Sequence, residues 1–144
     1  MKKIEMPLDP SAKAVLERAV AESARLNHEY IGTEHLALAL LRLNAGIAAS
    51  VLQDLGVDAE KLRAAIEAAV PTSAPRADGE PSRPFTTRAQ HAYALAQESA
   101  LALGDTALGA EHLLAGLVQE PGIGGQILSH HGVTADAVLA ALRD

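Results

Sequence analysis

The spacing of apolar residues along the chain predicts helices. Asp9-Pro10 can begin the first one, because Asp is a favourable N-cap and proline fits the first helical turn. From there to Leu26, small and apolar residues recur every three or four positions, at 12, 16, 19, 23 and 26. Leu62, Ile66 and Val70 follow one another at intervals of four. Both spacings are typical of amphipathic helices that bury one face.

The chain also repeats itself. Residues 31–36 read I-G-T-E-H-L and residues 108–113 read L-G-A-E-H-L, an offset of 77 that becomes 76 further on. The two copies cover residues of about 8–70 and 85–144. Between them, residues 71–84 are rich in proline and small polar residues, which predicts an exposed linker. We therefore expect one domain over residues 1–144 that contains two copies.

Each copy is expected to form four helices. In the first copy they run over about 10–26, 33–43, 47–55 and 59–70, and in the second over about 87–103, 110–120, 123–130 and 135–142. Thr87 to Gln90 fits a capping box at the start of the second copy. Four short helices bury little surface by themselves, so the copies should pack together. The expected fold is an all-α eight-helix bundle of two tandem repeats related by a pseudo-twofold axis.

Composition narrows the classes of function. Twelve Lys and Arg stand against 18 Asp and Glu, a formal net charge of −6, which argues against a nucleic-acid partner. The absence of cysteine excludes a disulfide framework and thiolate chemistry. No apolar run reaches the roughly 18 residues of a membrane span, and no apolar segment follows the N-terminal lysines as in a secretory signal. A cytoplasmic location is expected.

The repeated motif carries a family resemblance. The pattern [IL]-G-[TA]-E-H-L, followed by a G-I-[AG] turn and a later G-V, resembles the double Clp repeat, and the ClpC type of Clp N-terminal domain most of all. This resemblance implies a non-enzymatic module that binds substrate or adaptor proteins for a Clp AAA+ unfoldase-protease in stress response. The chain has no G-x-x-x-x-G-K-[ST] phosphate loop, so it is expected to lack the ATPase modules. It would then be a free-standing adaptor or decoy, or an excised domain.

The matching glutamates Glu34 and Glu111 are the first candidates for binding. A helix N-terminus attracts anions, and a carboxylate placed there attracts guanidinium groups, so the two together suit a zwitterionic ligand. The resemblance implies that these glutamates recognise phosphoarginine on tagged substrates. Hydroxyl groups that could assist are those of Thr33, Thr86 and Thr87.

The two candidate sites differ in sequence. Ala110 stands in the second copy where Thr33 stands in the first, and therefore offers no hydroxyl. The first copy begins Leu8-Asp9-Pro10-Ser11 where the second has Phe85-Thr86-Thr87-Arg88. Asp9 would repel a phosphate, which puts the equivalence of the two sites in question.

Other interpretations stay open. A glutamate in the first turn stabilises a helix by about 0.3–1 kcal/mol without any ligand. A groove at the junction of the two copies is a second candidate surface. The resemblance also leaves an alternative function, the binding or sequestration of a cyclic peptide antibiotic.

Four of the six histidines are expected to have structural roles, and none to bind a metal ion. His35 and His112 should be buried and bonded to the backbone, since neighbouring Glu and His lie about 100° apart on a helix and cannot face one metal ion together. His130-His131 suits the C-terminus of a helix. His28 and His91 are isolated and expected to be exposed. No catalytic residue, metal or cofactor is predicted.

Overall fold

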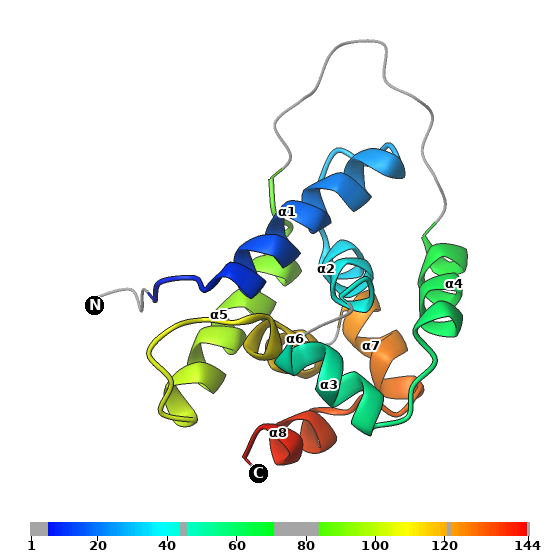
Figure 1. Ribbon diagram of the computed structural model, residues 1–144. Coiled ribbons are helices and arrows are strands. Elements are labelled where there is room, and N and C mark those ends of the chain that lie inside the picture. Colours follow the sequence, from blue (N-terminus) through cyan, green and yellow to red (C-terminus); the bar gives the residue numbers. More distant parts are fainter. Residues whose placement is uncertain (1–5, 44–45, 71–83, 121, 144) are drawn as a thin grey trace.

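Two sets of four helices follow one another along the chain (Figure 1). A computed structural model describes residues 6–43, 46–70, 84–120 and 122–143, and within these ranges it contains eight helices and no extended strand. The first set is α1 (Pro10–Arg25), α2 (Thr33–Leu41), α3 (Ile47–Asp54) and α4 (Ala59–Ala69). The second is α5 (Thr87–Ala102), α6 (Ala110–Gln119), α7 (Ile123–His130) and α8 (Ala135–Arg143). The all-α prediction is confirmed; the predicted linker lies outside the described residues except for Pro84.

Short polar side chains begin several helices. Asp9 caps α1 by accepting a hydrogen bond from Ala12 N at 2.9 Å, as predicted. The capping box predicted at Thr87 is wrong by one residue: Thr86 is the N-cap of α5, and its Oγ1 accepts from Ala89 N at 3.0 Å. Gln90 donates instead to the carbonyl of Phe85. A single hydroxyl bond from Thr86 therefore starts the helix without a reciprocal glutamine contact.

The central helices are α2 and α6. Every residue of α2 is buried, which is typical of a helix that is apolar on all sides and lies inside a domain. Helix α1 packs against α2, α5 packs against α6, and the two central helices touch each other. Leu40 of α2 and Leu117 of α6 occupy equivalent positions and are each 1% exposed.

A pseudo-twofold axis relates the two repeats. Two isolated parallel bridges join them, Leu8 to Leu108 and Ile31 to Phe85, and each bridge is the symmetry mate of the other. Helix α3 of repeat one packs on α6 and α8, and α7 of repeat two packs on α2 and α4 (Figure 1). The start of each repeat therefore lies beside the G-x-E-H motif of the other repeat, and the two repeats share one core.

Candidate functional site

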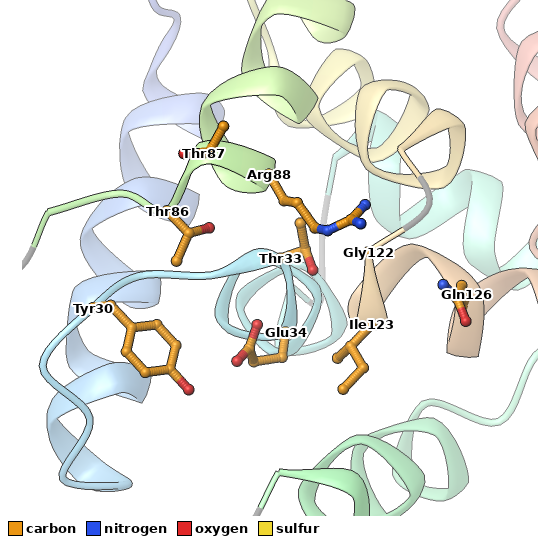
Figure 2. A pocket seen from close by; sticks show the side chains of 9 residues that line it. All are labelled: Tyr30, Thr33, Glu34, Thr86, Thr87, Arg88, Gly122, Ile123 and Gln126. Atoms are coloured by element: carbon orange, nitrogen blue, oxygen red, sulfur yellow. The ribbon is translucent and has the colours of Figure 1, made fainter.

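A pocket of about 540 Å³ lies at the junction of the two repeats (Figure 2). Three helices begin at this pocket, α2 and α5 with their first residues and α7 with Ile123. A helix N-terminus carries unpaired N–H groups and a partial positive charge. Three such ends at one pocket favour an anionic group. The lining consists of Tyr30, Thr33, Glu34, Thr86, Thr87, Arg88, Gly122, Ile123 and Gln126.

The structure brings four of the five predicted binding residues together. Thr33, Glu34, Thr86 and Thr87 line this one pocket, although the first pair belongs to repeat one and the second to repeat two. Glu111 is not among the lining residues, because it begins α6 at the equivalent place of the other repeat. The five predicted residues therefore divide between two places.

Glu34 is the acidic group of the pocket. Its side chain comes from the second residue of α2 and is directed into the pocket, yet the residue is only 8% exposed (Figure 2). The carboxylate folds back over Gly32, where a methyl group would collide with its Oε1. Burial, the nearby charge of Glu34 and a hydrogen bond to that carboxylate, in this order of size, raise the pKa of Tyr30. Glu34 is thus a largely buried carboxylate in the wall of the pocket.

An aromatic cluster holds Tyr30 at the wall of the pocket. The rings of Tyr30 and His28 stack with centroids 5.1 Å apart and an interplanar angle of 7°. His28 was predicted to be exposed, and this is wrong: it is 3% exposed, and its Nδ1 lies 2.7 Å from His35 Nε2. The contact was hidden in the sequence because it joins a loop residue to a helix residue seven positions later.

The buried histidines of the two motifs have the predicted structural role. His35 Nδ1 accepts from Gly32 N at 2.9 Å, and His112 Nδ1 accepts from Gly109 N at 2.9 Å. Each Nδ1 is therefore unprotonated, and the neutral ring carries its proton on Nε2. His112 Nε2 accordingly donates to Asp105 Oδ2 at 2.7 Å. His131 also fulfils its prediction, since it is the C-cap of α7.

Arg88 supplies the positive charge of the pocket. Its Nη1 lies 2.8 Å from Glu120 Oε1, and Glu120 Oε2 lies 2.6 Å from His91 Nδ1. Glu120 is buried, whereas the Arg88 side chain is 62% exposed, so the carboxylate anchors the guanidinium without covering it. Figure 2 shows the guanidinium above Thr33 and Gly122. His91 is exposed as predicted, although it is paired.

The hydroxyl of Thr33 is held by the neighbouring helix. Gly124 N donates to Thr33 Oγ1 at 3.2 Å. A methyl group on Gly122 would lie 2.7 Å from the same oxygen, so α7 packs closely on the start of α2. A threonine hydroxyl has one donor and two acceptor positions, and its O–H can therefore still serve a ligand.

In the described part of the chain, no group of three or more His, Asp or Glu side chains is arranged to hold a metal ion. No helix in these same ranges is long and apolar enough to cross a membrane.

The contact between Tyr30 and Glu34 gives a prediction that needs no ligand. Glu34→Gln should lower the pKa of Tyr30, because a neighbouring negative charge opposes formation of the phenolate. Burial remains, so this pKa should stay above its ordinary value. The ultraviolet absorbance of the phenolate measures the titration, and Tyr93→Phe removes the other tyrosine from the signal. Glu111→Gln is the matched control; an unchanged pKa in Glu34→Gln would contradict the prediction.

Fold and pocket together define a helical double-repeat domain with a pocket between its copies. The family model of the Clp repeat (R) N-terminal domain matches residues 7–84 and again residues 84–144. The chain belongs to this family, which confirms the resemblance seen in the sequence.

Curated relatives agree with this membership. Over 126 residues, 85% of the chain, it is 36% identical to Chaperone protein ClpB of Oceanobacillus iheyensis. It is also 36% identical, over 124 residues and 85% of the chain, to the Negative regulator of genetic competence ClpC/MecB of Bacillus subtilis. The chain spans about 15% of the length of these relatives.

Solved structures show the same fold. The N-terminal domain of the chaperone ClpD from Arabidopsis thaliana matches with a TM-score of 0.70 at 20% identity, covering 99% of this chain and 96% of that one. The N-domain of ClpV from Vibrio cholerae matches with a TM-score of 0.73 at 15% identity, covering 100% of this chain and 95% of that one.

Proposed function

We propose that this chain is a non-enzymatic binding domain that receives substrate or adaptor proteins for a Clp AAA+ unfoldase-protease. It would act in the cytoplasm as one domain, with repeats over about 8–70 and 85–144. Family membership and a ligand pocket between the repeats support this role. The chain spans about 15% of the length of its curated relatives, so the activity of the whole relatives is not carried over to it. The unfoldase is therefore proposed as a partner of this chain.

The proposed ligand is phosphoarginine on a substrate protein. Its phosphoryl group would meet the N-termini of α2 and α5, the hydroxyls of Thr33, Thr86 and Thr87, and the guanidinium of Arg88. Its own guanidinium would bind Glu34 by charge-assisted hydrogen bonds. The observation that carries this proposal is the buried Glu34 carboxylate inside a pocket where three helices begin. Only a ligand with both charges uses both parts of such a pocket.

Isothermal titration calorimetry with free phosphoarginine tests the ligand. Glu34→Gln should weaken binding by about 10- to 100-fold, because a hydrogen bond to a charged group contributes about 1.5–3 kcal/mol. Arginine and inorganic phosphate, which each carry half of the recognised chemistry, should bind more weakly than phosphoarginine. Equal heats for the wild type and Glu34→Gln would contradict this role. Binding of a cyclic peptide antibiotic without any binding of phosphoarginine would favour the alternative function.

A further inference from the structure

The place in repeat two that corresponds to the pocket keeps its glutamate and loses most of its other polar groups. Glu111 is equivalent to Glu34. The equivalents of Tyr30, Thr33, Thr86, Thr87 and Arg88 are Ala107, Ala110, Asp9, Pro10 and Ser11. Three hydroxyls, one phenol and one guanidinium are thus replaced by smaller, apolar or acidic groups, and only Ser11 and Asp9 bring new polar atoms.

The new polar atoms are bonded within the chain. Ala110 N donates to Ser11 Oγ at 2.9 Å, so the first N–H of α6 already has its acceptor. Ser11 Oγ donates in turn to Asp9 Oδ1 at 2.6 Å, and Ala12 N donates to the same oxygen at 2.9 Å. A methyl group on Gly109 would lie 2.7 Å from Asp9 Oδ2, so this carboxylate lies against the N-cap of α6. The chain itself supplies an anion at this helix N-terminus.

The pocket of repeat one and the equivalent position of repeat two also differ in charge and in available backbone N–H groups. Glu34 shares its pocket with Arg88, whereas Glu111 and the Asp9 carboxylate both flank Gly109. A phosphoryl group in repeat two would therefore face two carboxylates and no equivalent of the guanidinium. Pro10 also has no N–H to offer, although Thr87 at the equivalent position has one.

From these differences we infer that the domain binds one phosphoguanidinium ligand, in the pocket of repeat one, because Asp9 and Ser11 occupy the equivalent place in repeat two. This inference rests on the proposed function, since it concerns the same ligand chemistry. It narrows the prediction that Glu34 and Glu111 both bind the ligand to Glu34 alone.

The number of phosphoarginine molecules bound per chain distinguishes one site from two sites or none. Calorimetry with phosphoarginine should give one equivalent per chain, with more than tenfold weaker binding in Glu34→Gln and less than a twofold change in Glu111→Gln. Two equivalents of similar affinity would overturn the one-site inference and leave the proposed function standing. No binding at all would overturn phosphoarginine as the proposed ligand, and the inference with it.

A gain of a site is the stricter test. In the double variant Asp9→Thr with Ser11→Arg, repeat two acquires the hydroxyl and guanidinium that Thr86 and Arg88 provide in repeat one. A threonine caps α5 already, so the same residue should keep α1 capped. A second equivalent of phosphoarginine should then bind, and its absence would contradict the role given to Asp9 and Ser11.

Site-resolved nuclear magnetic resonance of the wild type shows whether repeat two binds phosphoarginine, even if the double variant fails to fold. Titration with phosphoarginine should shift the backbone amide signals of Thr33 and Glu34 in a saturable way. The amides of Ala110 and Glu111 should stay within the change produced by equal inorganic phosphate. Saturable shifts of both pairs would overturn the inference.

Discussion

Replacing Leu40 with alanine should lower the free energy of unfolding by about 3–4 kcal/mol, and replacing Leu117 should lower it by a similar amount. Both side chains are 1% exposed at equivalent positions of the two central helices. Removing most of a buried leucine loses apolar contact and leaves a cavity that close-packed neighbours fill only in part. Urea denaturation followed by circular dichroism measures the loss.

The control for this pair is Leu101→Ala. Leu101 is 49% exposed on α5, so its loss should change the stability by less than about 0.5 kcal/mol. Because α2 and α6 touch and each third helix packs on the other repeat, both core variants should unfold in one transition. Two separate transitions, with only one of them moved by each variant, would contradict a shared core.

Gly116→Val should destabilise the domain by about 3 kcal/mol. Gly116 lies in α6 directly against the backbone of α5: a Cβ at this position would collide with the carbonyl oxygen of Ala92 and lie 2.6 Å from Ala96 N. These are backbone atoms of a helix, so no side-chain rotation can relieve the clash. Thermal and urea unfolding measure the effect.

The sign of the stability change in Gly116→Ala tests the same backbone clash. In an open helix Gly→Ala stabilises by about 1 kcal/mol through helix propensity. Gly116→Ala should instead destabilise, because the clash begins with Cβ itself. Ala94→Val, on the exposed face of α5, is the control and should cost only a few tenths of a kcal/mol. A more stable Gly116→Ala variant would show that α5 and α6 can separate without cost.

Most of the helical framework could be predicted from the sequence because its signals are local. Apolar spacing located the faces that bury Ala12, Ala19, Leu62 and Ile66, all 0–1% exposed. The positive φ of 72° at Gly56 is the left-handed turn that glycine commonly provides after the end of a helix. Each of these features depends on residues within one or two helical turns.

The pocket was only partly predictable because it is assembled from distant segments. The glutamate and the threonines were found through the motif and the resemblance. Tyr30 and Arg88 were missed as lining residues, and so was the buried anchor Glu120. The available signal was the alignment of the two copies. It places Arg88 opposite Ser11 and so shows a positive charge that only the second copy carries at this position. The spacing of apolar residues does not show that the first helix of each repeat lies beside the G-x-E-H motif of the other repeat.

The paired bridges between Leu8 and Leu108 and between Ile31 and Phe85 have a consequence for how such a domain diverges after duplication. Each motif takes its glutamate from one half of the chain and other residues that face this glutamate from the other half. A mutation near the N-terminus thus changes the surroundings of Glu111 in the C-terminal motif. A chimaera that exchanges one half between two relatives would inherit mismatched surfaces, so the two halves must evolve as a pair.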